Sequence, residues 1–562
     1  MILQMIRKNI FLLLLFVNAI VYSSTMRETR AVWLTTNFQL DWPPKTFDEE
    51  IQKARLEEIF KNLKNKKFNT IYFQVRSNGA INYYSDNEPF SAYFKGEVGK
   101  VPNYDPLAYA IELGKKYFIE VHAWVNTIRA YAGKDARVLE HPKHLSNTHP
   151  EFLVESILPN GDISYWLNPS DTNAQDYLVD ILLDISSRYD IDGIHLDFFR
   201  YPNKNFDDEL SYLESESNLS RDDWRRNNLT TILRKFNEKK NPLNPYLKVG
   251  ATPIGIRKML KGAKGMEGFS EVYQDTETWL EEGLVDYLTP QIYWNFTDNP
   301  HFDILADDWV NKSYGKNIVL GLSAYHNEVI PELELMIEYS RKIRAAGISF
   351  FRYEHIASEE NNFFSEIAFP SNMVWKSKLY YQPNDKIIAD YQVVSDDMIL
   401  ITWQDTVKNK SDFRNYVLLN DAEPIKILSK ESNQLKLKFG NPAKLKYKYY
   451  LSKIDRLWNY TNLSNPIDVA VPYLNELKQS SKLYRRPLLF EENKAGSYIT
   501  MRSAINQNIL LDIISRENLR YQKMFKVKSG FNVIPLKVSS KFLRSIRITF
   551  INSGLVEEIN FY

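Results

Sequence analysis

The chain contains 562 residues, of which 44% are hydrophobic and 25% charged, a composition typical of a globular protein with two or three domains. Its 71 Lys and Arg residues nearly balance its 70 Asp and Glu residues, and a net charge of +1 gives no electrostatic basis for a nucleic-acid partner. The sequence has no cysteine, which excludes disulfides and thiolate metal sites.

Residues 1–23 have the layout of a secretory signal peptide. Arg7 and Lys8 precede an apolar run at 10–21, which is too short to span a membrane comfortably, and small residues follow it. We therefore predict cleavage near Ser23, a secreted or periplasmic location, and no membrane span in the mature protein. An uncleaved anchor is the alternative.

Residues 27–373 alternate between short apolar runs and amphipathic stretches. The strand-like runs are 30–36, 70–76, 119–126, 192–199, 248–255, 286–294, 317–325 and 347–354. Helical patterns lie at 47–66, 105–117, 173–189, 222–239, 272–283 and 331–347. Eight strands joined by helices predict a closed parallel (β/α)8 TIM barrel. An open doubly wound sheet is the alternative, but no Gly-rich phosphate loop follows the first strand.

The pattern changes after residue 373. Short alternating runs separated by Asn, Asp, Ser, Gly and Pro replace the helical periodicity, which predicts one or two β-sandwich domains. We predict a fibronectin III-like or Ig-like sandwich at 374–473 and a second β-rich domain at 474–562. Such modules bind glycans, position a catalytic domain or connect domains, and the sequence does not choose among these roles.

Alternation along each barrel strand separates side chains that face the helices from side chains that face the lumen. In the run 192–199 the apolar set is Ile194, Leu196 and Phe198, so His195, Asp197 and Phe199 are predicted to face the lumen. The same test on other strands assigns Tyr72, Gln74, Arg76, Glu120, His122, Trp124, Asn126, Thr289, Gln291 and Tyr293 to the lumen. Many of these polar groups gather at strand C-termini, where barrel active sites are built.

Several of the lumen residues are candidates for binding a substrate. His122 and Asn126 are suited to hydrogen bonds with substrate hydroxyls, and Trp124 and Trp294 could stack on a sugar ring or serve in packing. The other candidates are Gln74, Arg76, Arg200, Tyr201, Gln291 and Tyr293. The eight histidines show no HxH or HExxH spacing, so we predict neither a metal site nor a cofactor.

Ten segments between residues 27 and 355 match a known family in order. They are RETRAVWLTTNFQLDWP, NTIYFQVRSNGAINYYSDNEPFS, NYDPLAYAIELGKKY, EVHAWVN, WLNPS, YDIDGIHLDFFRYP, DWRRNN, VGATPIGIRK, YQDTETWLEEGLVDYLTPQIYW and IVLGLSAY. They resemble the glycosyl hydrolase-like 10 domain of bacterial secreted and envelope proteins. The resemblance implies a (β/α)8 fold and hydrolysis of O-glycosidic bonds in a bacterial or other polymeric glycan, and some relatives are associated with peptide-free peptidoglycan strands.

The resemblance includes one departure, at the end of the fourth strand. Relatives commonly carry two adjacent acids there, in the form DDYFYP, whereas this chain reads DFFRYP from Asp197 to Pro202. Phe198 therefore stands in place of the second acid. The alternative that this departure favours is a non-catalytic glycan-binding protein on a degenerate hydrolase barrel.

Glycoside hydrolysis normally uses two carboxyl groups, and Asp197 is the first candidate. Beside Arg76 or Arg200 it would stay ionised, which suits a nucleophile or charge stabiliser, and a purely structural ion pair is the alternative. Candidates for the second carboxyl group are Asp41 and Glu354, followed by Glu88. A substrate with N-acetyl groups could supply its own nucleophile, in which case one protein acid suffices.

Overall fold

A computed structural model describes residues 27–376, apart from 134, 135 and 159, and parts of 387–561. The gaps in the second range are 396–397, 407–412, 421–422, 439–445, 471–488, 494–495, 504–505, 529, 537 and 552–555. The predicted signal peptide lies outside the described residues. The chain divides into two compact units, one comprising Thr25–Tyr380 with Arg456–Asn459, and one comprising the rest.

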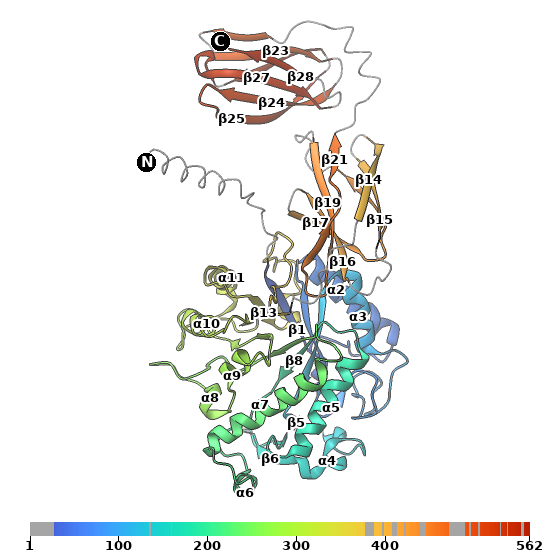
Figure 1. Ribbon diagram of the computed structural model, residues 1–562, viewed down its shortest axis with the longest axis vertical. Helices are drawn as coiled ribbons and strands as arrows, with labels where there is room; N and C mark the ends of the chain where they lie inside the picture. Colours follow the sequence, from blue (N-terminus) through green and yellow to red (C-terminus); the bar gives the residue numbers. More distant parts are fainter. Residues whose placement is uncertain are drawn as a thin grey trace, which may run out of the picture. The chain divides into compact units, whose positions relative to one another are not determined.

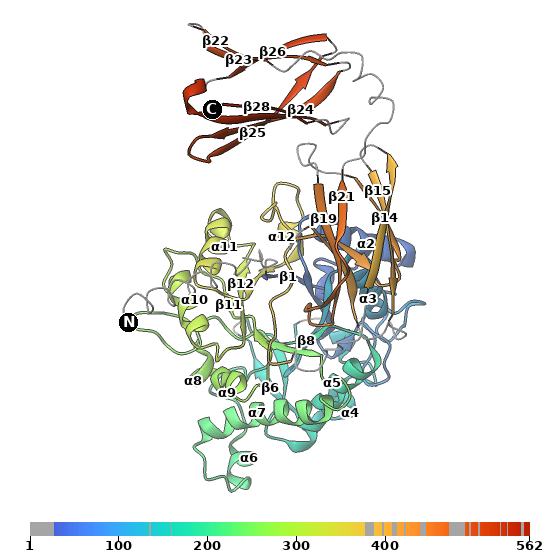
Figure 2. The same ribbon diagram turned by 45° about the horizontal axis from the view of Figure 1, so that its top comes forward.

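The first unit contains a closed parallel barrel (Figures 1 and 2). Its strands are β1 (Thr29–Leu34), β2 (Thr70–Ser77), β4 (Glu120–Asn126), β8 (Gly193–Asp197), β9 (Lys248–Ala251), β10 (Tyr287–Leu288) continued by β11 (Gln291–Ile292), β12 (Asn317–Ser323) and β13 (Gly347–Phe351). Each pairs with its neighbours in parallel, and β1 closes the barrel by pairing with both β2 and β13. The predicted TIM barrel, with its eight strands, is confirmed.

Helices surround the barrel. The longer ones are α2 (Glu49–Asn65), α3 (Pro106–Tyr117), α5 (Thr172–Arg188), α7 (Arg221–Lys240), α9 (Thr276–Glu281), α10 (Phe302–Asn311) and α11 (Leu333–Lys342). Asp48, Asp105 and Asp171 cap α2, α3 and α5 by accepting backbone N–H groups with their side chains. The sequence patterns predicted all of these helices except α10.

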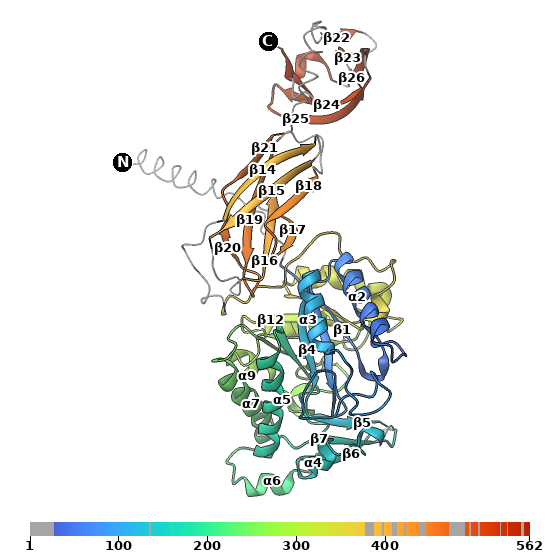
Figure 3. The same cartoon turned by 90° about the vertical axis from the view of Figure 1, so that its right-hand side faces the viewer.

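Short elements complete the first unit. They are β3 (Ala80–Ile81), β5 (Arg129–Ala132), β6 (Leu153–Ile157), β7 (Ile163–Leu167), α4 (Leu145–Thr148), α6 (Glu209–Glu214), α8 (Gly268–Glu271), α12 (Tyr353–Ile356), and the 3-10 turns Asn37–Gln39, Ala136–Val138, Pro150–Phe152 and Ile330–Glu332. Strands β5, β7 and β6 form a small antiparallel sheet. Figure 3 shows this sheet with α4 at one end of the barrel. Because β5 follows the C-terminus of β4, that end is the one where barrel active sites form.

The described part of the second unit consists of antiparallel sheets. One pair of sheets is formed by β14 (Ile387–Ser395), β15 (Met398–Asp405), β16 (Asn415–Asn420), β17 (Glu423–Ser429), β18 (Gln434–Lys438), β19 (Lys446–Ile454), β20 (Tyr460–Leu463) and β21 (Ile467–Ala470). The other pair is formed by β22 (Leu489–Asn493), β23 (Gly496–Ser503), β24 (Gln507–Ser515), β25 (Arg520–Val527), β26 (Gly530–Leu536), β27 (Leu543–Phe550) and β28 (Val556–Asn560), with a 3-10 turn at Ser540–Phe542. Each pair encloses its own hydrophobic core, so the predicted sandwich architecture is confirmed.

The predicted alternation holds in the middle of the barrel strands. Ile71, Phe73 and Val75 join the large core between sheet and helices, whereas Tyr72 joins a separate cluster inside the lumen. No helix among the described residues is long and apolar enough to cross a membrane.

Candidate active site

The lumen near the N-terminal ends of the strands, which we call the lower lumen, contains a fully engaged polar chain. Trp33 donates to Nε2 of His195 (3.0 Å), and Nδ1 of His195 lies 3.1 Å from the Tyr287 hydroxyl. That hydroxyl lies 2.7 Å from Nδ1 of His122, whose Nε2 lies 3.1 Å from Glu120. One arrangement of protons satisfies all of these groups: each group in the chain from Trp33 through His195, Tyr287 and His122 donates one hydrogen bond to the next, and Glu120 accepts the last. His122 therefore has no nitrogen left for a substrate, which corrects its predicted role.

Asp197 closes β8 at the opposite end, in the part of the cavity that we call the upper lumen. Asp197 is only 6% exposed. Oδ2 accepts from the indole N–H of Trp124 (3.0 Å), and Oδ1 accepts from the backbone N–H of Phe198 (2.7 Å). Trp124 is itself buried, so it positions the carboxyl group of Asp197; of the two roles that we had left open for Trp124, packing applies rather than stacking on a sugar ring.

The pKa of Asp197 shifts in the opposite direction to the one that a neighbouring arginine would cause. Burial raises the pKa of its carboxyl group, and the N–H groups of Phe198 and Trp124 and the charges of Arg129 and Arg200 only partly oppose this rise. No ion pair joins Asp197 to another described residue. A carboxyl group with a raised pKa suits a general acid better than the ionised nucleophile that we had expected.

Arg76 was expected beside Asp197, but it lies in a separate buried ion pair. Its Nε and Nη2 atoms donate to Glu88 at 2.6 and 2.5 Å. The reason is an irregularity in strand pairing: Gln74 pairs with Trp124, yet Arg76 pairs with Val125, so one residue of β2 is bulged out. A bulge redirects the side chains beyond it. The side chain of Arg76 therefore does not face the lumen, contrary to the prediction.

Glu88 is removed from the candidate acids by the same pair. Its side chain has no exposed surface, and the Tyr177 hydroxyl donates to it at 2.9 Å. Burial tends to raise the pKa of Glu88, but the charge of Arg76 and the hydrogen bonds from Arg76 and Tyr177 together lower it. Glu88 is therefore ionised and structural.

Gln74 and Asp41 both hold the chain that follows β1. Oε1 of Gln74 accepts from the backbone N–H groups of Thr36 (3.0 Å) and Asn37 (2.9 Å), so this oxygen is not available to a substrate. Asp41 accepts from the N–H of Thr35 at 2.8 Å. These bonds fix the loop above β1.

The other oxygen of Asp41 is engaged too. It accepts from Arg352 (2.7 Å) and from the backbone N–H of Glu354 (2.8 Å), and the Asp41 side chain has no exposed surface. Asp41 is therefore a structural carboxylate and not the second catalytic acid that we predicted. The Glu354 side chain is 61% exposed and pairs with Arg352 at 2.7 Å, which leaves it accessible.

The turn after Asp197 reverses two predicted orientations. Phe198 has a positive φ of 50°, a backbone conformation that a residue with a side chain rarely adopts. Phe199 consequently packs in the outer core against Trp279, and Phe198 turns toward the side of Asp197 where the β5–β7 sheet lies. Tyr201 is fully buried in the same core and is not a substrate-binding residue.

Five predicted binding residues remain near Asp197 or at neighbouring strand ends. Arg200, Gln291, Tyr293 and Trp294 are partly exposed. Asn126 pairs with Asp197 across β4 and β8, and its buried Oδ1 has no hydrogen-bond partner among the described residues. Burial and the charge of Asp197 raise the pKa of Tyr293 well above its ordinary value, so its hydroxyl stays protonated.

Arg129, at the start of β5, is a further residue of the site that was not predicted. Its guanidinium carbon is 3.3 Å from the centroid of the Phe198 ring. Arg129 lies three residues beyond the predicted strand 119–126, outside the alternation that we used, so the sequence offered no signal for it.

A small hollow of about 50 Å³ lies beside the upper lumen. Its walls include Asn37, Phe38, Ser77, Asn78, Tyr93, Tyr131 and Gly133. Phe38 is 55% exposed, so one face of its ring is accessible to a ligand. Ser77 connects the hollow to the strand ends because it accepts from Asn126 at 3.3 Å. The hollow adds aromatic and amide groups that the sequence analysis had not assigned to a site.

Among the residues that the structure describes, no three His, Asp or Glu side chains are grouped so that they could hold a metal ion. The described site therefore consists of one buried carboxyl group, two arginines, a tyrosine hydroxyl and aromatic rings. This set lies at the C-terminal end of a (β/α)8 barrel, the face where barrel active sites are built, and it includes a carboxyl group of the kind that glycoside hydrolases use.

The comparisons with known proteins identify the family. The family model Glycosyl hydrolase-like 10 matches residues 28–334, more than half of the chain, so the chain belongs to this family.

Individual proteins agree with this assignment. The chain is similar to the glycosyl hydrolase YngK of Bacillus subtilis (strain 168), with 31% identity over 338 residues, 56% of this chain and 65% of YngK. It is also similar to the glycosyl hydrolase DigH of Escherichia coli (strain K12), with 28% identity over 366 residues, 58% of this chain and 83% of DigH. The chain thus spans slightly less than two thirds of the length of YngK.

A solved structure similar to this chain is the PgaB (BpsB) glycoside hydrolase domain from Bordetella bronchiseptica. The TM-score is 0.46 with 12% sequence identity, and the match covers 60% of this chain and 97% of that domain.

Proposed function

We propose that the protein hydrolyses O-glycosidic bonds of an N-acetylated bacterial glycan, with peptide-free peptidoglycan strands as the substrate. The observation that carries this proposal is the carboxyl group of Asp197, buried at the C-terminal end of the lumen and held by two N–H donors. Its raised pKa lets it carry a proton for the leaving glycosidic oxygen.

The geometry of the other acids favours participation by the substrate. Asp41 and Glu88 are enclosed in hydrogen bonds and have no exposed side-chain surface, so neither can reach an anomeric carbon. An N-acetyl group beside the cleaved bond supplies an amide oxygen that can attack that carbon instead. The C–O bond to the leaving sugar then breaks, its electron pair takes the proton of Asp197, and water subsequently opens the cyclic intermediate.

Tyr293 is suited to orient the amide. Its pKa is raised well above the ordinary value, so it remains a hydrogen-bond donor at any ordinary pH, and the charge of Asp197 is among the causes of that rise. A donor to the amide oxygen or nitrogen would fix the group in the reactive orientation.

The test is to incubate the protein with peptide-free peptidoglycan strands and to follow new reducing ends. We expect cleavage by the wild type and by Glu354→Gln, and loss of cleavage with retained binding in Asp197→Asn. Strands from which the acetyl groups have been removed should remain intact. Cleavage of the deacetylated strands, or inactivity of Glu354→Gln, would show that a second protein carboxylate is required.

The pH profile is a second test. Because the general acid must be protonated, kcat/KM should fall as pH rises through the raised pKa of Asp197. An activity that instead requires ionised Asp197 would fall as pH decreases, and would exclude the role of general acid.

A second candidate function is glycan binding without cleavage. Phe198 favours it, because this side chain stands where relatives carry another acid and turns toward the same side as Asp197. Under this alternative no glycan is cleaved by the wild type, and Asp197→Asn binds as well as the wild type does.

We further propose that the protein acts outside the cytoplasm, where peptidoglycan lies. The support is the signal-like pattern of residues 1–23. Fractionation of the source cells, with N-terminal sequencing of the recovered protein, should give a chain that starts near Ser24 in the exported fraction. A full-length chain retained in the cytoplasm would contradict this proposal.

A further inference from the structure

Two guanidinium groups flank Asp197 and face the same aromatic ring. The Cζ atoms of Arg129 and Arg200 lie 3.3 and 5.4 Å from the centroid of the Phe198 ring. Arg200 also lies over the ring of Trp166, at 5.4 Å. The two cations are therefore neighbours, and the charge of Arg200 is among the effects that lower the pKa of Arg129.

Neither arginine pairs with a carboxylate in the described part of the chain. Nε of Arg129 is buried and has no hydrogen-bond partner there. Arg200 donates to two backbone carbonyl groups, at 3.0 and 3.4 Å. Both side chains thus keep donors that no carboxylate of the barrel occupies.

The five buried arginines in the described part of the barrel differ from these two partly exposed ones, because each of the five pairs with a carboxylate. The pairs are Arg30 with Glu28, Arg76 with Glu88, Arg225 with Asp208, Arg226 with Asp223, and Arg257 with Asp308. Pairing is the usual requirement for burying a charge. Arg129 and Arg200 are partly exposed, and they have no such carboxylate partner among the described residues, at the place where a substrate is expected.

The local charge is unbalanced in the state that catalysis would use. Burial lowers the pKa of both arginines, to about 10 in each case, so they remain charged at neutral pH. When Asp197 carries its proton, the two positive charges beside the Phe198 ring have no counter-charge among the described residues that pair with them, and a bound anion would relieve their repulsion. Guanidinium groups bind carboxylates through paired N–H donors.

We propose that Arg129 and Arg200 form a carboxylate-binding subsite beside Asp197, so that the glycan carries an acidic sugar at the bond that is cleaved. Peptide-free peptidoglycan strands meet this requirement, since every second sugar carries a lactyl carboxylate. The kinetic consequences rest on the proposed glycoside hydrolysis, whereas binding of the carboxylate does not.

Binding is measured first, by calorimetry with the full chain carrying Asp197→Asn. The two probes are peptide-free peptidoglycan strands and the same strands with their carboxyl groups methyl-esterified. We expect the ester to bind on the order of 10- to 100-fold more weakly, because charge-assisted hydrogen bonds are lost. Added salt should weaken binding of the native strands and leave binding of the ester nearly unchanged.

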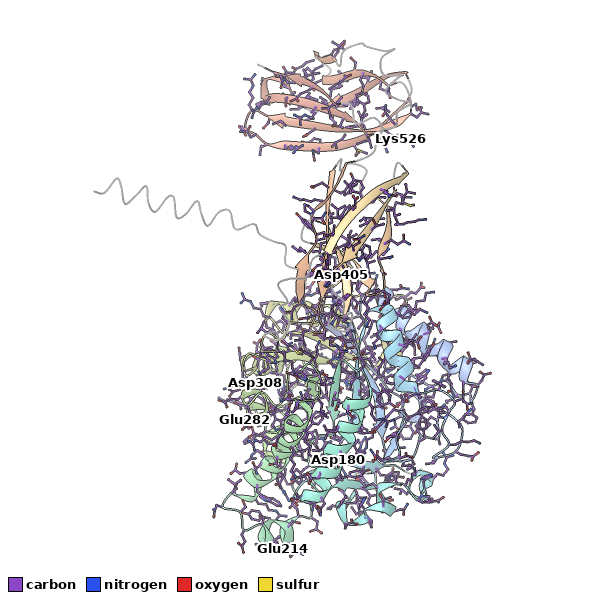
Figure 4. The ribbon with its side chains drawn as sticks, turned by 45° about the vertical axis from the view of Figure 1, so that its right-hand side comes forward. Asp180, Glu214, Glu282, Asp308, Asp405 and Lys526 are labelled. Atoms are coloured by element: carbon purple, nitrogen blue, oxygen red, sulfur yellow. The ribbon has the colours of Figure 1, made fainter. Side chains whose placement is uncertain are left out.

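The arginine variants assign the effect to the subsite. Arg129→Gln and Arg200→Gln should each weaken binding of the native strands about tenfold and leave the ester unaffected. Arg234→Gln is the matched control, because Arg234 lies on α7 and pairs at the surface with Glu282, which Figure 4 labels. It should bind both probes like its parent, and thermal unfolding checks that each variant is folded.

The active enzyme supplies a further readout. A substrate carboxylate would offset the two positive charges that lower the pKa of Asp197, so the pH at which kcat falls should lie higher than the pH at which kcat/KM falls. This separation should disappear with the ester and in Arg129→Gln.

The outcomes separate this inference from the proposed function. Equal binding of strands and ester, or equal weakening of both probes in the arginine variants, overturns the subsite. If strands and ester are cleaved equally well, hydrolysis stands and the subsite fails. If the ester binds weakly but the wild type cleaves nothing, the subsite stands and hydrolysis fails.

Discussion

The lower and upper halves of the barrel lumen are both polar, yet they differ in how their polar groups are satisfied. In the lower lumen, Trp33, His195, Tyr287, His122 and Glu120 form one chain in which every donor meets an acceptor. Burial lowers the pKa of His195 well below its ordinary value, so this chain carries a neutral imidazole.

The upper lumen leaves several groups incompletely satisfied. Asp197 has a raised pKa, Arg129 has a buried Nε without a hydrogen-bond partner in the described residues, and Asn126 has such an Oδ1. A network in which every polar group is hydrogen-bonded stabilises a fold. Buried polar groups without a hydrogen-bond partner are instead groups that a bound ligand can satisfy. The presence of polar residues therefore does not distinguish the candidate site from the rest of the lumen. The site is distinguished by polar groups whose hydrogen bonds and charges are not balanced by their neighbours.

The largest effect should come from Asp197→Asn. Removing the general acid should lower kcat on peptide-free strands by a factor on the order of 10² to 10⁴, with binding retained. Reducing-end assays and calorimetry measure the two quantities. A variant that keeps wild-type turnover would show that the upper lumen is not the catalytic region.

Glu88→Gln should mainly affect stability. It leaves Arg76 buried without its counter-charge, which should lower the free energy of unfolding by about 3–5 kcal/mol. Urea unfolding of the wild type and the variant measures this difference. A loss of activity without a loss of stability would mean that Glu88 takes part in catalysis after all.

Tyr287→Phe tests the lower lumen directly. The variant removes the hydroxyl that joins two histidines, and leaving their nitrogens unpaired should cost about 1–3 kcal/mol of unfolding free energy. At a temperature where the variant is folded, kcat should equal that of the wild type. A large fall in kcat would remove the distinction between the two halves of the lumen.

Phe38→Ala tests the hollow beside the upper lumen. Loss of an exposed aromatic platform should weaken binding of longer strands by about 1 kcal/mol, roughly a fivefold rise in KM, with kcat unchanged. Short strands that do not reach the hollow serve as the control. If short and long strands respond alike, the hollow does not bind glycan.

The smallest expected effect is a pH-dependent change in stability. The pKa of Asp197 is higher in the folded than in the unfolded chain, so the folded state binds more protons between the two values, and ionisation lowers stability as pH rises through the folded pKa. Asp197→Asn cannot ionise. The variant should be at least as stable as the wild type at neutral pH, and the two should converge near about pH 3 in thermal unfolding. A variant that is less stable at neutral pH would mean that ionised Asp197 stabilises the fold.

The sequence by itself determined the architecture. Eight short apolar runs separated by amphipathic stretches predict the barrel, because short apolar runs are typical of buried strands and amphipathic stretches of surface helices. Alternation also placed Asp197 and His195 in the lumen, and the later shift to short alternating runs predicted the sandwiches. Helix α10 was not recognised, and the domain boundaries stay predictions.

The tertiary structure decided which polar residues belong to the site, because hydrogen-bond partners come from segments far apart in the sequence. A bulge in β2 sent Arg76 to Glu88, and the left-handed turn at Phe198 exchanged the directions of Phe198 and Phe199. Alternation cannot register either event, since one extra residue or one positive φ reverses every assignment beyond it. Arg129 could be assigned to the site only from the tertiary structure, in which it lies over the ring of Phe198.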